Sequence, residues 1–368
     1  MSSRLVSITD LTISQLQEMV QSFDEPEFRA KQLLHWVYGR LASSYDEMTD
    51  VPQTFRERLQ RESRLHTLSA LDKVTGSDGT TKILFELADG KTIESILMPY
   101  PKIKGKPRFT VCVSTQVGCP IKCPFCATGQ YGLERNLTPG EIIDQVLYFA
   151  GHLRGQGEDR RKSGNEPVNI ITNVVFMGMG EPLASFDNLW QAIEMLNLPQ
   201  AFGLGARNMV ISTAGLVPQI KRLSQEKLQV GLAVSLHASD DALRDKLVPI
   251  NREYNLEQLI RACQEYSELK GRRLSFEYVL FEGINDSVIQ AQSLSRLLKG
   301  MKCHVNLIAA NRNQDGGYRP SSSQAVLAFE SELKRNHIVC TVRQPRGLDI
   351  GAGCGQLRSR HHEAKEQS

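Results

Sequence analysis

Three cysteines stand close together in the stretch VGCPIKCPFCATG, at Cys119, Cys123 and Cys126. Thiolates are the usual ligands of iron–sulfur clusters, and three of them leave one iron of a four-iron cubane without a protein ligand. Such an iron can bind the amino and carboxylate groups of a methionine whose sulfur carries a third carbon substituent. It can then pass an electron to that sulfonium. Zinc is the alternative metal, but a structural zinc site takes a fourth ligand, and the next histidine is His152. The spacing therefore predicts an iron–sulfur cluster.

A glycine-rich segment, GMGEPL, runs from Gly178 to Leu183 and follows the hydrophobic run Val174–Met177. Glycines let the backbone approach a ligand closely, and the carboxylate of Glu181 can pair with the ammonium group of a bound methionine. A plain turn at the end of a strand has the same composition. The position after a predicted strand favours a ligand site.

The other cysteines stand in different settings. Cys354 lies between glycines in RGLDIGAGCGQL, which is typical of an exposed segment. Cys112 lies on a predicted strand, where it either faces a ligand site or is buried as a small apolar side chain. Cys263, Cys303 and Cys340 fall within helix or strand patterns, and we expect them to be buried and unreactive.

Strand and helix patterns alternate along the part of the chain that carries these residues. Six candidate strands are Thr110–Ser114, Asn173–Met177, Met209–Ser212, Gly231–Leu236, Ser275–Leu280 and Val305–Ala309. Helical spacing occurs between most of them, in Glu141–Leu153, Asn188–Leu196, Leu256–Leu269 and Ser287–Leu298. A last run at Ile338–Arg343 closes the series. The alternation predicts an α/β fold with a parallel sheet, as an open or partial barrel.

The N-terminal part has a different pattern. Helical spacing occurs in Leu11–Phe23, Phe28–Leu41 and Pro52–Glu62. Alternating runs on either side of an Asp-Gly turn, in TKILFELADGKTIESILMP, then predict a β-hairpin.

Composition narrows the class of protein. A chain of 368 residues, 40% of them hydrophobic, is long enough for a large barrel and an accessory domain. A formal net charge of +3 permits an RNA partner without requiring one. We find no signal peptide and no run of about 18 apolar residues, so we expect a cytoplasmic protein without a membrane span. Cysteines in that compartment bind metals or react more often than they form structural disulfides.

The cysteine spacing, with Phe125 before the last cysteine, resembles the signature of the radical S-adenosylmethionine (radical SAM) superfamily. A longer series of segments resembles one family within it, the RNA adenine methyltransferases RlmN and Cfr. These segments are FRAKQLLHWVY, RFTVCVSTQVGC, CATGQYGLERNLTPGEI, FMGMGEPL, ISTAGL, SLHA, LVPIN, GIND, VNLI and CGQL. They occur in order from about Glu25 to Leu357, so the chain is identified as a member of this family over nearly its whole length.

The resemblance implies a fold and an order of domains. The family has a partial (β/α)6 radical SAM barrel, a small N-terminal helical domain and a β-hairpin linker. We therefore expect an RNA-binding helical domain at 1–70, the linker at 71–108 and the barrel at 109–345. Residues 346–368 would form a C-terminal segment with the reactive cysteine and a flexible tail.

The resemblance also assigns residues to the site. One [4Fe–4S] cluster is expected on Cys119, Cys123 and Cys126. The pocket for S-adenosylmethionine is expected to contain Gly180, Glu181, Ser212, Ser235, Leu236, His237 and Asn311. The reacting side chains would be Cys354, Cys112 and Glu94. Taken alone, Glu94 would be read as a surface residue of a strand. Asn311 stands in VNLIAANRN, where the family usually has a proline and an aromatic residue before the asparagine.

The implied reaction uses two molecules of S-adenosylmethionine per turnover, because carbon 2 of adenine is not nucleophilic. One methylates the thiolate of Cys354, and a radical from the second activates the S-methyl group for addition to the ring. Glu94 takes the ring proton. Cys112 then attacks the sulfur of Cys354, which frees the methylated RNA and forms a transient disulfide that an external thiol reduces.

The expected substrates are an adenosine in the peptidyl-transferase centre of 23S rRNA and the adenosine 3′ to the anticodon of tRNA. A flavodoxin- or ferredoxin-like electron donor and a thiol reductant complete the expected partners of a monomeric enzyme. Pro182 favours carbon 2 over Cfr-type methylation of carbon 8. Two alternatives remain, a radical SAM enzyme on a non-RNA substrate and a catalytically silent RNA-binding relative. The presence of all five key cysteines argues against the second.

Overall fold

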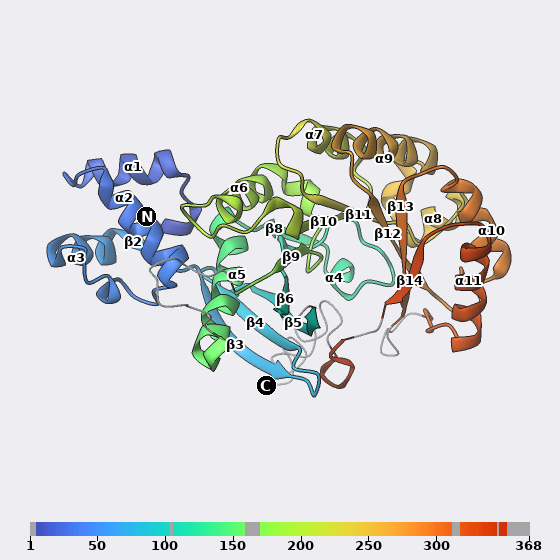
Figure 1. Ribbon diagram of the computed structural model, residues 1–368, viewed down its shortest axis with the longest axis horizontal. Coiled ribbons are helices and arrows are strands. Elements are labelled where there is room, and N and C mark those ends of the chain that lie inside the picture. The colour runs from blue at the N-terminus through green and yellow to red at the C-terminus, as the bar shows by residue number, and fades with distance from the viewer. Residues whose placement is uncertain (1–4, 104–105, 159–169, 311–316, 344–345, 352–368) are drawn as a thin grey trace.

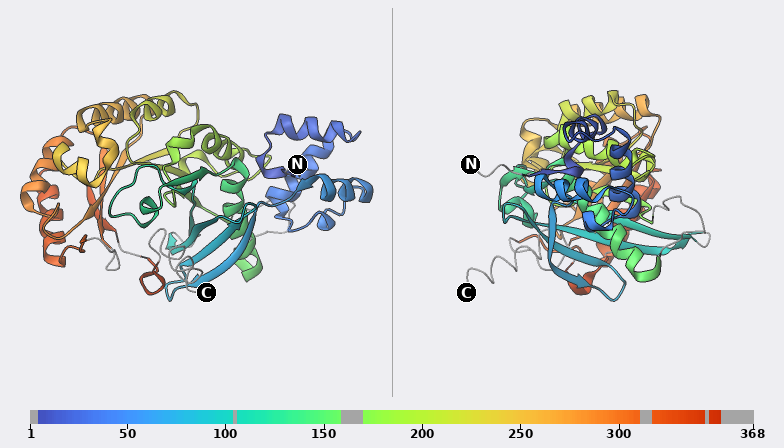
Figure 2. Two further views of the ribbon diagram at one scale, coloured as in Figure 1. Left: turned by 180° about the vertical axis from the view of Figure 1, so that it is seen from behind. Right: turned by 90° about the vertical axis from the view of Figure 1, so that its left-hand side faces the viewer.

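A computed structural model describes residues 5–103, 106–158, 170–310, 317–343 and 346–351 of the chain. Figure 1 shows short N-terminal helices at one end and a twisted sheet that fans across the rest of the molecule. Larger helices line one side of this sheet, and Figure 2 shows the same arrangement from behind and from the N-terminal end.

In the described part of the chain, a ten-stranded sheet contains a series of seven strands that pair in parallel with one another. These are β6 (Lys106–Cys112), β9 (Asn173–Phe176), β10 (Met209–Thr213), β11 (Gly231–Ser235), β12 (Leu274–Leu280), β13 (Cys303–Ala309) and β14 (Cys340–Arg343). The six candidate strands and the closing run at β14 are thus all present. The predicted α/β fold with a partial barrel is confirmed, and β14 forms one edge of the described sheet.

Helices connect the parallel strands and pack on their outer face. They are α5 (Pro139–Leu153), α6 (Phe186–Asn197), α7 (Val217–Gln225), α8 (Asp241–Leu247), α9 (Leu256–Lys270), α10 (Val288–Leu297) and α11 (Ser323–Arg335). Local sequence explains where they begin. Before α5, Thr138 and Glu141 form a capping box, and Asn255 and Gln258 do the same for α9. Helices α7, α8 and α11 are not among the helical stretches named from the sequence; α8 buries only Arg244 and Leu247, too few residues for an apolar repeat.

The N-terminal helices have apolar residues of their own to bury. They are α1 (Ile13–Ser22), α2 (Phe28–Leu34), which continues as a π-helical turn (His35–Arg40), and α3 (Gln53–Glu62). Two short strands, β1 (Val6–Ser7) and β2 (Ser63–Arg64), pair in parallel and bring the two ends of this region together. The predicted helical region is therefore present, and its apolar core is continuous with that of the barrel.

Three antiparallel strands extend the barrel sheet beyond β6. They are β3 (Leu68–Thr75), β4 (Thr81–Leu87) and β5 (Thr92–Ile103), and β5 pairs with β6. The predicted hairpin at Asp89-Gly90 is β4–β5, and Gly90 has the positive φ of 77° that its turn requires. The segment expected as a linker therefore belongs to the main sheet, which places β4 and β5 beside the first barrel strand.

A smaller sheet and a short helix frame the cysteine-rich loop. The sheet consists of β7 (Gln116–Gly118) and β8 (Leu133–Asn136), and the helix is α4 (Ala127–Gln130). Among the described helices, none has the length and apolar character that crossing a lipid bilayer requires. Cys263, Cys303 and Cys340 are buried, as predicted.

Candidate active site

The loop with the three clustered cysteines lies between β7 and α4 and is closed by backbone hydrogen bonds. The amide of Cys119 donates to the carbonyl of Gly132 at 2.8 Å, and the amide of Cys126 donates to the carbonyl of Cys123 at 3.0 Å. Gly118 has a φ of 80°, and a Cβ added there would lie 1.8 Å from the carbonyl oxygen of Gly132. The loop can thus reach its closed shape only with glycine at this position.

The thiols of this loop influence one another. Burial raises the pKa of Cys119 to about 12, with further contributions from Glu181 and Cys126. Burial, followed by the thiols of Cys126 and Cys119, also raises the pKa of Cys123. Binding a metal group as thiolates would therefore release protons.

The three thiols of this loop have the chemistry that a cubane iron–sulfur cluster requires of its protein ligands. In the described part of the chain, no three His, Cys, Asp or Glu side chains are grouped closely enough to hold a single metal ion. A [4Fe–4S] cluster instead takes its protein ligands on separate irons, from thiolates. Three half-buried thiols on one closed loop fit that group.

The glycine-rich segment after β9 brings a carboxylate to the ends of the parallel strands. Gly180 has a φ of 109°, and a Cβ there would lie 2.6 Å from Cβ of Gln116, so the segment passes tightly over β7. The carboxylate of Glu181 accepts hydrogen bonds from the amides of Ala214, at 2.6 Å, and Leu183, at 3.1 Å. Burial raises the pKa of Glu181 to about 7, although these hydrogen bonds oppose the shift. Such a carboxylate can receive an ammonium group.

Buried Arg244, on α8, holds the ends of β10 and β11 in place. Its guanidinium donates to the carbonyls of Ala214, at 2.7 Å, Ser235, at 3.1 Å, and Leu236, at 3.2 Å. Ser212 lies on the adjacent strand, β10, opposite Ala233, two residues before Ser235. The structure therefore brings Ser212, Ser235 and Leu236 together. Sequence analysis missed Arg244, although the family segment LVPIN follows it closely.

His237 follows directly and faces the cysteine loop. Its φ is 60°, a left-handed conformation that is uncommon outside glycine. Nδ1 accepts a hydrogen bond from the amide of Val279 at 3.1 Å, and the carbonyl accepts one from Nδ2 of Asn285 at 2.8 Å. Its ring meets that of Phe125 edge to face, at 5.2 Å between centroids. Burial, and then the charge of Arg244, lower the pKa of His237 to about 3, so the ring is neutral.

Glu94 is buried, which corrects the reading of this residue as a surface position. Its side chain, on β5, is 2% exposed, and Oε2 lies 2.7 Å from Nζ of the fully buried Lys82 on β4. In the register of the sheet, Ile96 stands opposite both Lys82 and Cys112. Because side chains alternate between faces, Lys82, Glu94 and Cys112 share one face. The sequence shows an alternating strand here but not that this face is covered.

The thiol of Cys112 is protonated in this environment. Burial raises its pKa to about 11; the charges of Arg343 and Lys82 act against this shift, whereas Glu94 adds to it. The residue ends β6, and its carbonyl accepts a hydrogen bond from Oγ of Ser95 at 2.7 Å. Cys112 is thus a buried thiol close to two positive charges and one carboxylate.

The segment 346–351 packs against the β3–β4 hairpin, as its red loop shows in Figure 1. Oδ2 of Asp349 accepts a hydrogen bond from the amide of Ser77 at 2.7 Å. Nζ of Lys82 donates to the carbonyl of Gly351 at 3.3 Å. These contacts hold the backbone at residue 351 beside the pair of Lys82 and Glu94.

Two of the predicted site residues, Cys354 and Asn311, lie outside the described residues. The remaining predicted residues form two groups. The cysteine loop, Gly180, Glu181, Ser212, Ser235, Leu236 and His237 surround the ends of β9, β10 and β11, whereas Glu94 and Cys112 lie on β5 and β6.

The inner face of the sheet holds a carboxylate that sequence analysis did not single out. Glu277, on β12, stands beside Ser235 in the register and is 5% exposed. Its Oε1 accepts a hydrogen bond from Nδ2 of Asn306 at 2.8 Å, and its Oε2 has no hydrogen-bond partner among the described residues. Burial raises its pKa. In the sequence it is one acidic residue in an ordinary strand pattern, SFEYVL.

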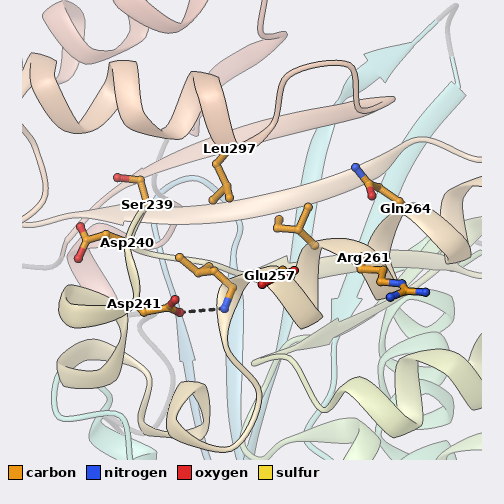
Figure 3. A pocket seen from close by; sticks show the side chains of 9 residues that line it. Ser239, Asp240, Asp241, Glu257, Arg261, Gln264 and Leu297 are labelled. Atoms are coloured by element: carbon orange, nitrogen blue, oxygen red, sulfur yellow. Dashed lines mark hydrogen bonds between the residues drawn. The ribbon is translucent and has the colours of Figure 1, made fainter.

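A hollow of about 760 Å³ lies elsewhere, between the start of α8 and helices α9 and α10. Figure 3 shows Asp240, Asp241 and Glu257 around it, with the carboxylate of Asp241 accepting a hydrogen bond from the amide of Leu256 at 2.8 Å. It contains none of the predicted site residues. The cysteine loop and the strand ends therefore remain the candidate site.

Comparison with protein families matches two models to the chain. Residues 6–65 match the ribosomal RNA large subunit methyltransferase N-terminal domain of RlmN, and residues 113–291 match the radical SAM superfamily. That superfamily implies S-adenosylmethionine and a [4Fe–4S] cluster, and the cysteine loop lies within the second match.

Individual proteins are similar over almost the whole chain. A probable dual-specificity RNA methyltransferase RlmN of Chloroflexus aurantiacus is 46% identical over 96% of this chain and 92% of its own length. The dual-specificity RNA methyltransferase RlmN of Syntrophobacter fumaroxidans is 44% identical over 96% of this chain and 98% of its own length. The crystal structure of a radical SAM methyltransferase from Sphaerobacter thermophilus superposes with a TM-score of 0.89 at 44% identity, covering 95% of this chain and 98% of that one. The chain belongs to the RlmN family of radical SAM RNA methyltransferases.

Proposed function

We propose that this protein methylates carbon 2 of adenine in RNA through a methyl group carried on Cys354. The observation that carries the proposal is the placement of Glu94 and Cys112 on one buried face, beside the backbone that leads to Cys354. A proton acceptor and a second thiol next to a methyl-carrying thiol are what this chemistry requires. The RNA substrate follows from the names of the relatives.

Cys119, Cys123 and Cys126 would hold one [4Fe–4S] cluster. Glu181 would receive the ammonium group of S-adenosylmethionine, and Gly180, Ser212, Ser235, Leu236, His237 and Asn311 would line its pocket. When bound, two molecules of S-adenosylmethionine per turnover and the cluster supply a methyl group and a carbon radical. A neutral His237 would add no positive charge to a pocket for a cationic cofactor.

The chain's own residues perform the remaining steps. Cys354 carries the methyl group and becomes linked to the adenine ring through it. After the adduct has given up one electron to an oxidised iron–sulfur or flavin centre, Glu94 accepts the ring proton. Cys112 loses its thiol proton and its sulfur attacks that of Cys354; the bond between the Cys354 sulfur and the methylene carbon breaks, and the carbon takes up a proton to become the new methyl group. An external thiol reduces the resulting disulfide.

The proposed substrates are an adenosine in the peptidyl-transferase centre of 23S rRNA and the adenosine 3′ to the anticodon of tRNA. The proposed setting is the cytoplasm, with a monomeric enzyme, a flavodoxin- or ferredoxin-like electron donor and a thiol reductant. The division into 1–70, 71–108, 109–345 and 346–368 stays a prediction, as does RNA binding by the N-terminal helices.

The two reacting thiols give the test of this function. In Cys112→Ala, the carrier works but nothing releases the adduct, so the protein should remain covalently bound to labelled RNA. In Cys354→Ala, no adduct can form. After reaction of the reconstituted enzyme, a denaturing gel should show a slow band containing RNA for Cys112→Ala and none for Cys354→Ala.

Cys340→Ala is the matched control, because Cys340 is a buried strand cysteine without a proposed role. It should methylate RNA without a persistent band. Normal turnover in both Cys112→Ala and Cys354→Ala would show that neither thiol takes part in the chemistry.

A further inference from the structure

Lys82 is a fully buried lysine that none of the steps above uses. Its Nζ lies 2.7 Å from Oε2 of Glu94 and donates a hydrogen bond to the carbonyl of Gly351 at 3.3 Å. Gly351 stands three residues before Cys354 in the sequence. One ammonium group thus contacts both the proposed proton acceptor and the backbone that leads to the proposed methyl carrier.

The burial of this pair bears on its chemistry. Lysine is almost never fully buried unless it is paired, and a buried carboxyl group without a partner tends to take up a proton. A fixed positive charge at hydrogen-bond distance instead favours the carboxylate. A general base works only when ionised, so this pairing favours the form of Glu94 that can accept a proton. The thiol of Cys112, on β6, and the guanidinium of Arg343, on β14, also lie near the pair.

We infer that Lys82 is a positioning residue whose ammonium group pairs with the carboxylate of Glu94 and directs it at the ring proton of the adduct. The inference deepens the proposed function and rests on it. In this step, the C–H bond of the ring carbon breaks, an O–H bond forms on Glu94, and the electron pair of the C–H bond returns to the ring. The adduct has by then passed one electron to an oxidised iron–sulfur or flavin centre. Lys82 gives up no proton.

The lifetime of the covalent adduct tests this role. Single turnovers of the reconstituted holoenzyme with labelled RNA are stopped in denaturant, and the protein–RNA band is followed over time at several pH values. In Lys82→Met the band should persist near neutral pH. Its decay should return at higher pH, because a buried carboxyl group without its paired cation is harder to ionise. Glu94→Gln should keep the band at every pH.

Two further variants separate the charge from the shape of the side chain. Lys82→Arg keeps the positive charge, so its adduct should decay over the wild-type pH range. Lys91→Met removes a lysine at the turn of the β4–β5 hairpin, which lies 2.5 Å from Glu134 of β8 in a solvent-accessible pair, and should behave as wild type. Decay of the Lys82→Met band at the wild-type rate and pH contradicts the inference. A band that persists at every pH also contradicts it, since it indicates a structural role.

Iron content and melting temperature are measured for every variant. If Lys82→Met does not retain its cluster, Lys82→Arg carries the test, and a trapped adduct in that charge-conserving variant contradicts the inference. If the proposed function itself is wrong, the result is different, because Cys112→Ala would then give no covalent protein–RNA band.

Discussion

At the scale of single residues, two buried carboxylates have different surroundings, and the proposed reaction gives them different roles. Glu181 has two backbone amides as hydrogen-bond donors and a pKa raised to about 7 by burial, so it has capacity for a cationic ligand. Glu94 has the ammonium of Lys82. Glu181 is suited to binding the ammonium group of a substrate. Glu94 is suited to accepting a proton, because Lys82 already supplies the cation at its site.

The cluster assignment is tested residue by residue. Anaerobically reconstituted wild-type protein should bind about four irons and four sulfides, and Cys123→Ala should lose this capacity, because one of three thiolates is missing. Iron and sulfide analysis with absorption spectra checks the outcome. Cys263→Ala, which changes a fully buried cysteine of α9, should retain full iron content. A colourless, zinc-loaded and fully active protein would contradict the assignment.

At the scale of elements, the geometry of the site depends on hydrogen bonds that fix the backbone at the ends of the barrel strands. Arg244 satisfies three carbonyls at the ends of β10 and β11, and Nδ2 of Asn285 satisfies the carbonyl of His237. The strands and their succession along the chain could be predicted from apolar and β-branched residues, because each strand is long enough to show a pattern. The short helix α8 could not, since its one deeply buried polar residue is an arginine, which has no apolar signature.

Removal of this arginine should destabilise the barrel. Arg244→Met leaves buried carbonyls without a donor, and breaking such a buried charged network typically costs about 3–5 kcal/mol. Urea unfolding of the two proteins measures the difference. Arg261→Met is the control, because Arg261 on α9 is 79% exposed, and it should change the free energy of unfolding by less than about 0.5 kcal/mol. Equal stability of Arg244→Met and wild type would show that the network contributes nothing.

At the scale of the whole molecule, the N-terminal helices join the barrel through α5. The carboxylate of Asp144 accepts two hydrogen bonds from Thr67 at 2.7 Å, and its other oxygen lies 3.5 Å from Nδ1 of His66. Burial alone would lower the pKa of His66, but the hydrogen bond and the charge of Asp144 raise it above its usual value. The contact with Asp144 therefore stabilises this junction when His66 is protonated.

Stability at the junction should fall as the solution becomes alkaline. A histidine whose pKa is raised on folding contributes its full stabilisation below the unfolded value of about 6.5, and loses it as pH rises through the folded value. The urea midpoint of the wild type should thus decrease, relative to that of His66→Gln, as the pH rises above the unfolded value of about 6.5. Asp144→Asn should remove the same pH dependence. Parallel pH profiles for wild type and His66→Gln would show that the pair is not coupled to folding.

Some parts of the candidate site could be predicted from the sequence and others could not. The cysteine loop and the GMGEPL segment could be located from the sequence because ligand chemistry restricts their composition. The burial of Glu94 could not, because it depends on β5 pairing with β6 and on residues 346–351 packing against the hairpin. Such contacts join segments far apart in the chain, and no local pattern contains them. Cys354 and Asn311 stay predictions from sequence.

The central claim, methylation of carbon 2 of adenine in RNA, has one direct measurement. Reconstituted holoenzyme is incubated with unmodified 23S rRNA fragments and tRNA, S-adenosylmethionine, a flavodoxin reducing system and a thiol, and the RNA is then digested to nucleosides for mass spectrometry against synthetic standards. We expect 2-methyladenosine from both RNAs, and none with Cys354→Ala. Exclusive formation of 8-methyladenosine would contradict the assignment of carbon 2, and unmodified RNA from an enzyme that holds its cluster and cleaves S-adenosylmethionine would contradict an RNA substrate altogether.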